Sequence, residues 1–413
     1  MIAIAAVVSE HLEEARFLWT QRRRAVHAPN YSRRQFTDLD QRLEAHIDGL
    51  RVAEAGGWDA AVELLESPQP HDFFPVAVLA IEAVDGRLVQ IVERAEEMPA
   101  ALPALISALG WVRPKCLGGQ VKPLLEAASP VRQYLGIAAC AVHRRDPGLP
   151  LEHALSSGVP AVRCRALRSA GELGRLDLLP MVLNGLGDDL LAARFYAARS
   201  AVLLGHRGKA LEALIGGAFE TGPHQLACLG LSLQSAGMER GHEVLRQLGE
   251  VPDANRLRIL GSGFLGSVRY VPWLIEQMSR PVLARVAGEA FVNITGADFN
   301  LGQLAQPPPA DFEDGPTEDP ADENVEVPED VALPWPDAER VKLWWDQHRA
   351  RFDPTARYLL GLPLGRDACA DVLKGGFQRQ RVMAAVHLAL LNPGASLFNT
   401  SAPAWRQQKL LTQ

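Results

Sequence analysis

The sequence of 413 residues has few aromatic residues, no closely spaced cysteines and no long apolar run. Aromatic residues make up 6% of the chain, whereas apolar residues of all kinds make up 47% and are mostly Ala, Leu and Val. Because β-sandwiches favour aromatic and β-branched residues, this balance points to helices. A chain with this apolar content can bury a sizeable core, which excludes global disorder.

The cysteines indicate a reducing compartment, and the apolar segments indicate neither a membrane span nor a signal peptide. The five cysteines are odd in number, lie far apart and form no CxxC pair, so we predict free thiols. The longest apolar runs, 1–8 and 73–81, are too short for a membrane span, and the start MIAIAAVVSEHLEEARF lacks the basic region of a signal peptide. We therefore predict a cytoplasmic protein without a membrane span.

The sequence also lacks the common catalytic and ligand-binding motifs. It has no Walker A, GxSxG, HExxH or EF-hand pattern, so we predict no catalytic residue, no cofactor and no metal site.

GSGFLG, at residues 261–266, matches GxGxxG but lies within a helical pattern with no preceding strand. His242 and Glu243 form a single His-Glu pair, whereas a di-iron site needs several histidine and carboxylate ligands. For Cys140 and His143, three residues apart, we predict a buried thiol beside a turn imidazole rather than a nucleophile and its base.

The formal net charge of −7 is unevenly distributed. Residues 306–339 hold twelve of the 49 acidic residues and none of the 42 basic ones, so the rest of the chain, with 37 acids, carries a net charge of +5. This segment is rich in proline and lacks apolar periodicity, which is typical of a linker or an inserted loop. We predict that residues 311–330 are mobile or dock on basic residues of the repeat array predicted below at 59–305. Neither charge value predicts nucleic-acid binding, and no dense Arg/Lys stripe follows successive predicted helices.

Repetition is the most informative feature that the sequence does have. Segments 163–186 and 198–219 align, each with an Ala/Leu-rich helix, a terminal glycine, a polar turn and a second apolar helix. The terminal glycine recurs at intervals of 31, 32, 29 and 30 residues, as Gly174, Gly205, Gly237, Gly266 and Gly296. Two short helices with their turns fill about 30 residues, and a lone hairpin cannot cover its own apolar face. Glycine after a helix supplies the left-handed residue that ends it.

We therefore predict an all-α fold, an α/α superhelix of stacked helical hairpins with helical caps at both ends. The signatures of tetratricopeptide and ankyrin repeats are absent, and the pattern is closer to HEAT-type repeats. The predicted segments are a helical N-terminal cap at 1–58, a repeat array at 59–305, an acidic Pro-rich linker or loop at 306–337 and a helical C-terminal cap at 338–413.

Four strings carry a family resemblance. They are LDQRLEAHIDGLRVA (39–53), AFVNITGADF (290–299), RYLLGLPL (357–364) and APAWRQQKLL (402–411). In this order they resemble a bacterial family of HEAT-like repeat proteins whose genes often lie beside type VI secretion clusters that carry spike-tip and adaptor genes. The resemblance implies a helical repeat fold and a link to secretion, but no catalytic residues.

Two groups of residues are candidates for binding a partner. The basic group is Arg22, Arg23, Arg24, Arg33 and Arg34, which could hold an acidic partner or the chain's own acidic segment. The aromatic group is Trp344 and Trp345, which point about 100° apart on a helix, so that one can pack inwards while the other anchors a partner.

The leading functional hypothesis is a non-catalytic protein-protein interaction scaffold, an adaptor or chaperone of type VI secretion that binds an effector or its spike-tip carrier. One alternative is an immunity protein that binds a cognate toxin. Another is a HEAT-like lyase or base-modifying enzyme, since a repeat fold does not fix function. The sequence leaves the oligomeric state open.

Overall fold

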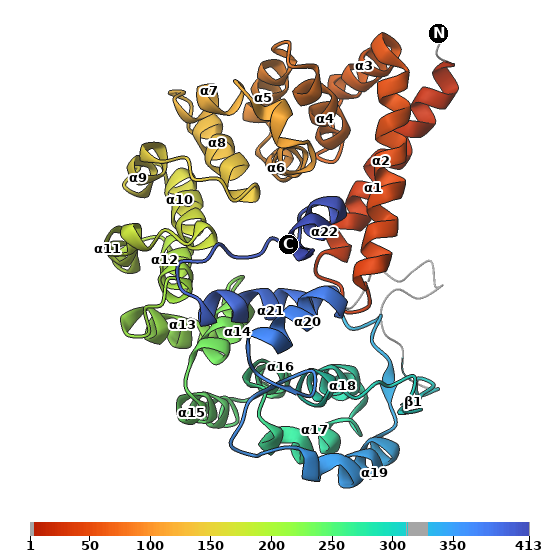
Figure 1. Cartoon of the computed structure of the whole chain (residues 1–413), viewed down its shortest axis with the longest axis vertical. Helices are drawn as coiled ribbons and strands as arrows, with labels where there is room; N and C mark the ends of the chain where they lie inside the picture. The colour runs from red at the N-terminus through yellow and green to blue at the C-terminus, as the bar shows by residue number, and fades with distance from the viewer. Residues whose placement is uncertain (1–3, 311, 313–328, 413) are drawn as a thin grey trace. The chain divides into compact units, whose positions relative to one another are not determined.

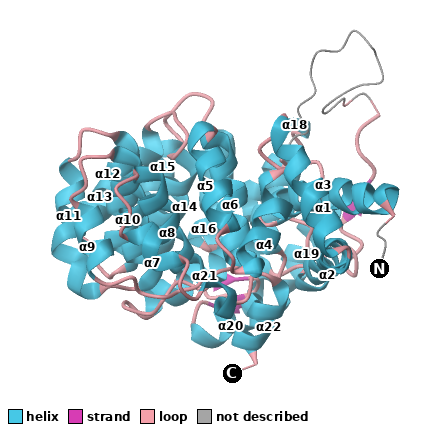
Figure 2. Cartoon of the chain, turned by 90° about the horizontal axis from the view of Figure 1, so that it is seen from above, coloured by secondary structure: helices cyan, strands magenta, loops and turns pink. Residues whose placement is uncertain are grey.

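The computed structural model describes residues 4–310, 312 and 329–412. This part of the chain is mostly helical, with 22 α-helices and four strands of two residues each (Figure 2). The predicted all-α fold is therefore confirmed, whereas the HEAT-like superhelix stays a prediction. None of the described helices is both long enough and apolar enough to cross a membrane.

The chain divides into two compact units. Unit 1 consists of Met1–His27, Tyr31–Gly205 and Pro393–Gln413, and unit 2 consists of Ala28–Asn30 and His206–Asn392. Unit 1 is therefore discontinuous in sequence, because the last residues of the chain belong with the first half. The predicted segment boundaries at residues 58, 305 and 337 stay a prediction.

Unit 1 holds thirteen of the described α-helices and five short 3-10 helices. They are α1 (Ala5–Ala25), α2 (Arg33–Val52), α3 (Glu54–Glu63), η1 (Leu64–Glu66), α4 (Phe73–Ala83), α5 (Arg87–Glu97), η2 (Pro99–Ala101), α6 (Leu102–Trp111), η3 (Pro114–Leu117), α7 (Val121–Leu125), α8 (Pro130–Val142), α9 (Leu149–Leu155), α10 (Pro160–Leu173), η4 (Leu176–Leu178), α11 (Leu179–Asn184), η5 (Gly185–Gly187), α12 (Leu191–Leu203) and α22 (Ala404–Leu411).

In unit 1, helices pack mainly against their near neighbours in the sequence. Helices α1 and α2 form a long pair, and α4, α6, α8, α10 and α12 then pack one on the next in chain order (Figure 1). Helix α2 begins at a capping box, in which Ser32 and Gln35 satisfy each other's backbone N–H groups. Proline occupies the first turn of α6, α8, α10 and α11, where its missing N–H costs nothing. The fully buried Phe36, Phe73 and Phe74 lie in the core between these helices.

Unit 2 holds nine α-helices, two 3-10 helices and the four strands of the described chain. They are α13 (Lys209–Phe219), α14 (Gln225–Ser235), α15 (Met238–Leu248), α16 (Asn255–Leu265), η6 (Val268–Tyr270), α17 (Val271–Gln277), α18 (Pro281–Thr295), β1 (Ala305–Gln306), β2 (Trp335–Pro336), α19 (Ala338–His348), η7 (Arg349–Arg351), β3 (Tyr358–Leu359), β4 (Leu362–Pro363), α20 (Arg366–Gly375) and α21 (Gln378–Leu391).

Unit 2 repeats the same packing on a smaller scale. Helices α14, α16 and α18 pack in chain order, and α20 pairs with α21. The strands form two separate antiparallel pairs, β1 with β2 and β3 with β4. The core includes the fully buried Phe291, which contacts Phe299 edge-on with ring centroids 6.4 Å apart.

In unit 1, the C-terminal segment returns across the ends of three stacked helices. Leu397 donates its backbone N–H to the carbonyl of Glu172 at the end of α10, with a distance of 3.0 Å. The amide of Asn399 donates to the carbonyl of Val142 at the end of α8, also at 3.0 Å. Arg406 donates to the carbonyl of Gly110 near the end of α6 at 2.6 Å. The segment therefore satisfies carbonyl groups that a helix end leaves without an intrahelical partner.

In unit 2, the segment that includes β3 plays the equivalent part. Tyr358 donates its N–H to the carbonyl of Gly266 after α16 at 2.8 Å, and Leu360 donates to the carbonyl of Asn293 in α18 at 2.7 Å. Arg357 donates to the carbonyl of Ala236 after α14 at 2.6 Å. Both units thus have a late segment of chain bonded to the C-terminal ends of their stacked helices.

The predicted role of the terminal glycines is confirmed at four of the five positions. Gly174, Gly205, Gly266 and Gly296 follow a helix and have φ between +68° and +97°. The prediction is wrong for Gly237, whose φ of −65° is ordinary and which precedes α15. At Gly174 and Gly296 an added Cβ would lie 2.3 Å from the carbonyl oxygen of Gly394 and of Leu360, respectively. These glycines therefore both end a helix and let the late segments approach.

The four strings that carry the family resemblance lie in two pairs in space. String 39–53 lies in α2, and string 402–411 includes α22, which packs against α2. String 290–299 includes the end of α18, where string 357–364 is hydrogen-bonded. These strings therefore hold the contacts between each late segment and its helices.

Candidate functional site

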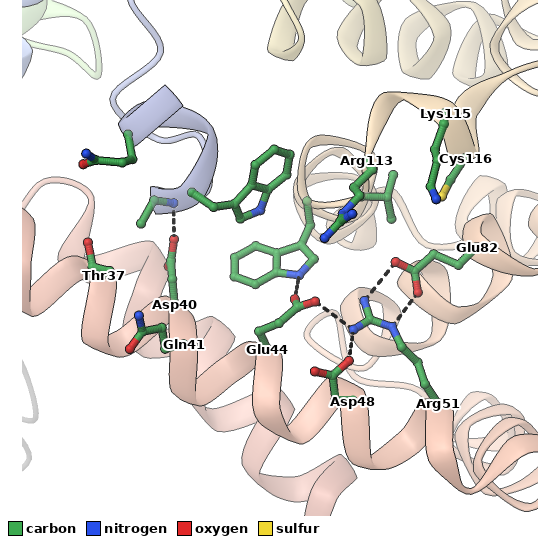
Figure 3. A pocket seen from close by; sticks show the side chains of 15 residues that line it. Thr37, Asp40, Gln41, Glu44, Asp48, Arg51, Glu82, Arg113, Lys115 and Cys116 are labelled. Atoms are coloured by element: carbon green, nitrogen blue, oxygen red, sulfur yellow. Dashed lines mark hydrogen bonds and ion pairs between the residues drawn. The ribbon is translucent and has the colours of Figure 1, made fainter. Parts of the chain in front are cut away.

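A cavity of about 870 Å³ lies in unit 1 where α2, the end of α4, the turn from α6 into η3, and α22 meet (Figure 3). We call it the α2–α22 pocket. Its volume falls within the range of small-ligand and peptide side-chain pockets. Its lining residues are Thr37, Asp40, Gln41, Glu44, Asp48, Arg51, Glu82, Trp111, Val112, Arg113, Lys115, Cys116, Ala404, Trp405 and Gln408.

One wall of the pocket is an acidic network around Arg51. The guanidinium of Arg51 binds the carboxylate of Glu82 with two hydrogen bonds, at 2.7 and 2.9 Å, and binds Glu44 at 2.7 Å and Asp48 at 2.5 Å (Figure 3). Burial favours a lower pKa for Arg51, but the hydrogen bonds that it donates to Glu82 and Glu44 outweigh this effect and raise the pKa. The indole N–H of Trp111 donates to Glu44 at 2.5 Å. This wall is held rigidly, and its polar atoms are largely satisfied within the protein.

The other side of the pocket has free binding groups. Arg113 and Lys115 are exposed, and neither forms an ion pair within the described chain. Trp405 of α22 is 44% exposed, with the guanidinium of Arg406 5.2 Å from the centre of its ring. Two cations and an open aromatic face can take an acidic side chain and an apolar side chain of a protein ligand. The pocket thus has an acidic wall on one side and, on the other, basic and aromatic groups that can bind a segment of a protein ligand.

The predicted basic group is split by the fold. Arg22 is buried in unit 1, where it binds both carboxylate oxygens of Asp40, at 2.6 and 3.3 Å, and the carbonyl of Ala402 at 3.2 Å. Its guanidinium also lies 4.7 Å from the ring centre of Phe36. Arg22 therefore holds α1, α2 and the C-terminal segment together, and its guanidinium is not open to a partner.

The other four arginines lie at the surface around the α1–α2 turn. Arg23, Arg24 and Arg34 are exposed, and Arg33 is partly covered by its hydrogen bond to Gln408 of α22. Arg23 lies 5.3 Å from the ring centre of Trp19. Their role in binding a partner stays a prediction.

The two adjacent tryptophans lie in α19 of unit 2 and both pack within that unit. Trp344 contacts Phe291 edge-on at 5.6 Å between ring centres and stacks on His348 at 4.2 Å. Trp345 is 9% exposed and lies 5.5 Å from Phe352. The two side chains do point in different directions, but neither presents an open face comparable to that of Trp405.

Cys140 and His143 do not form an activated pair. Burial raises the pKa of the Cys140 thiol to about 11, so the nucleophilic thiolate is disfavoured. Burial and the charge of Arg406 lower the pKa of His143 to about 4, although the bond to Leu109 acts in the opposite direction. Its Nε2 lies 2.7 Å from the carbonyl oxygen of Leu109 and, since a carbonyl only accepts, Nε2 carries the proton.

The remaining weak motifs are structural as well. Gly261 and Gly263 of GSGFLG lie inside α16, where an added Cβ would meet Leu245 at 2.7 Å and Ala290 at 3.2 Å. His242 Nδ1 lies 3.1 Å from the hydroxyl oxygen of Tyr270. Within the described ranges, no three His, Cys, Asp or Glu side chains are placed to hold a metal ion, and all five cysteines are free.

Most of the acidic segment 311–330 lies outside the described residues. The prediction that this segment is mobile or docks on basic residues can therefore be compared with the structure only at residues 329 and 330. There, Asp330 is 6% exposed and binds Arg256 of α16 with two hydrogen bonds, at 2.5 and 3.0 Å. The backbone carbonyl of Glu329 accepts from Arg379 at 3.0 Å. Arg256 belongs to the predicted repeat array, so Asp330 docks as the prediction allowed, whereas Arg379 lies outside that array.

Sequence reasoning missed the α2–α22 pocket because its residues come from four distant parts of the chain. One signal was available, since strings 39–53 and 402–411 were both singled out and both line the pocket. Comparisons of this chain with protein-family models, curated protein sequences and solved structures find no match.

Proposed function

We propose that the chain is a non-catalytic interaction scaffold of the HEAT-like type, which binds a segment of a partner protein in the α2–α22 pocket. The observation that carries the proposal is the exposed side of that pocket, where Trp405, Arg113 and Lys115 face solvent. The chain-order packing of α4, α6, α8, α10 and α12 supports a superhelix of stacked hairpins. A partner segment with an apolar residue next to acidic residues fits this site by charge and shape.

With the family resemblance, the partner is a type VI secretion effector or its spike-tip carrier, and the chain acts in the cytoplasm as an adaptor or chaperone before loading. Binding a partner segment in this pocket suits such a role, because internal hydrogen bonds fix the pocket's acidic wall and lower the entropic cost of ordering it on binding. An immunity protein would use the same kind of pocket to block a toxin.

The test is a pull-down from the native bacterium with wild-type protein and pocket variants. We expect the wild type to recover an identified effector or spike-tip protein, and Trp405→Ala or Arg113→Glu to lose it. Phe17→Ala, which removes an aromatic side chain that is 55% exposed on α1, and Arg145→Glu are matched controls that should keep it. Equal recovery by all variants would place the partner elsewhere, and recovery of no secretion component would reject the proposal.

Deletion of the gene separates the two binding roles. Loss of an adaptor stops effector export but leaves growth unchanged. Loss of an immunity protein slows or kills a strain that keeps the toxin gene.

A further inference from the structure

Four arginines gather around one carboxylate in unit 1, on residues distinct from the α2–α22 pocket. Arg144 follows α8, Arg165 and Arg168 belong to α10 together with Glu172, and Arg199 belongs to α12. We call the four guanidinium groups the arginine cluster. Because α8, α10 and α12 pack in chain order, three successive helical layers contribute to it.

Glu172 occupies only part of the cluster. It is 4% exposed, and its two oxygens bind Arg165 at 2.5 Å and Arg168 at 2.7 Å, with Arg144 at 3.8 Å. Four guanidinium groups against one carboxylate leave a net charge of +3. Glu172 is the carboxylate that attracts Arg144, Arg168 and Arg199 alike.

The excess charge is costly within the protein alone. Burial lowers the pKa of Arg199 to about 10, against the attraction of Glu172, and the charges of Arg168, Arg144 and Arg165 lower it further. The Nη1 atom of Arg199 is buried and has no hydrogen-bond partner among the described residues. A buried donor without an acceptor is rare in folded proteins, and an oxygen of a bound anion would satisfy this one.

The cluster is also reachable from solvent. The side chain of Arg168 is 45% exposed, although its Nε is bound to Glu172. The fork of a guanidinium matches the oxygens of phosphate and carboxylate groups in a two-bond arrangement. A phosphate carries nearly two negative charges at pH 7, which suits a net +3 better than one carboxylate does.

We propose that the arginine cluster is a binding site for a phosphate group, carried by free phosphate or by a phosphate ester. Arg199 and Arg168 supply the open donors. Arg144 and Arg165 are held in place by other contacts: Arg144 donates to the carbonyl of Leu397 at 2.6 Å, and Arg165 donates to the hydroxyl of Ser169 at 3.0 Å. The proposal does not depend on the partner pocket.

The test measures inorganic phosphate binding to the full chain by calorimetry and by thermal unfolding, against sodium chloride at equal ionic strength. We expect phosphate to bind and to raise Tm beyond the effect of chloride. Arg199→Gln and Arg168→Gln should weaken binding about tenfold or more, since each removes a charged hydrogen bond. Arg145→Gln, which makes the same charge change at an exposed neighbour, should bind as the wild type does.

The unliganded stability separates a binding role from a structural one. Without phosphate, Arg199→Gln should unfold at the same Tm as the wild type or higher, because one of four mutually repelling cations is gone. A lower Tm together with unchanged phosphate binding would overturn the proposal. So would the absence of phosphate binding, or binding of an oligoglutamate peptide in its place.

Two further arms identify the source of the phosphate and keep the proposals apart. Tighter binding of a nucleoside monophosphate or phenyl phosphate than of inorganic phosphate would assign the site to an ester, and the reverse order would assign it to free phosphate. Trp405→Ala should keep phosphate binding, so failure of the partner proposal would leave this one standing.

Discussion

At the scale of single residues, the glycines after the stacked helices have two separable roles: they adopt a left-handed backbone conformation, and they allow another chain segment to approach closely. The left-handed backbone alone disfavours any other residue, and close approach of another chain segment adds a steric limit. Gly174 combines both, with φ +73° and the Gly394 carbonyl next to it. Gly86, in the same unit, has φ +95° and open space where a Cβ would lie.

We therefore predict a graded loss of stability for these two positions. Gly86→Ala should cost about 1 kcal/mol from backbone strain, and Gly174→Ala about 2–4 kcal/mol, because the returning segment must also move. The midpoint of urea unfolding, followed by tryptophan fluorescence, checks this. Equal effects at the two positions would mean that the returning segment is not tightly bound at α10.

His143 makes the stability of unit 1 sensitive to acid. Burial lowers its pKa to about 4 in the folded protein from the ordinary histidine value of 6.5, so the unfolded chain binds the proton more readily. The stabilisation is fully present above pH 6.5 and is lost as the pH falls from about 6.5 to 4. We predict that His143→Gln removes about 2 kcal/mol of the loss seen between pH 7 and 5. Denaturant titrations at both pH values check this, and His153→Gln, at an exposed position, should retain the full loss.

The residues that sequence reasoning placed well are those whose role depends on local backbone shape. The helix-ending glycines show themselves through a regular interval. The arginine cluster was missed, although Arg168 and Arg199 are 31 residues apart, the same interval that separates Gly174 from Gly205. Whether such an arginine points at a neighbouring layer depends on side-chain packing, which the spacing does not reveal.

At the scale of elements, arginines from the late segments close the ends of stacked helices. Arg406 donates to Gly110 in unit 1, and Arg357 donates to Ala236 in unit 2. Burial lowers the pKa of Arg406 to about 10, with a further contribution from Arg22 and Arg144. Hydrogen bonds to carbonyl groups that have no partner within their helix offset the free-energy cost of burying this arginine.

We predict that Arg406→Met speeds amide hydrogen exchange in α6 and α8, with a local cost of about 2–3 kcal/mol from lost charged hydrogen bonds. Arg24→Met, at an exposed position of α1, should leave exchange unchanged. Hydrogen-exchange mass spectrometry resolves the affected helices. Faster exchange spread evenly over unit 1 would argue for general loosening instead of loss of a helix-end contact.

The helices themselves were predictable, whereas their long-range partners were not. The Ala/Leu-rich helix, terminal glycine and second apolar helix of segment 163–186 are local signals, and they indicate α10 and α11 correctly. The predicted terminal cap at 338–413 contains helices, but residues 393–413 belong to unit 1. That assignment depends on contacts such as the one between the Ala404 N–H and Asp40, at 2.7 Å, which are too distant in sequence for periodicity to indicate.

At the scale of the whole molecule, the acidic segment sets the sign of the net charge. Residues 313–328 contain seven acids and no basic residue, so their deletion brings the formal net charge from −7 to 0. We predict that this variant has a higher isoelectric point and lower solubility near pH 7, because net charge keeps proteins apart. Isoelectric focusing and precipitation curves check this. Replacing the same seven acids by Gln should reproduce the effect if charge is the cause.

The discontinuity of unit 1 has a consequence for the order in which the protein is made. Residues 1–205 leave the ribosome long before residues 393–413, because residues 206–392, which form nearly all of unit 2, are synthesised between them. The carbonyl groups at the ends of α6, α8 and α10 therefore lack their hydrogen-bond donors from residues 393–413 until translation is nearly complete. A chain that ends before residue 393 therefore carries an incomplete first unit, even though residues 206–392 of unit 2 are all present.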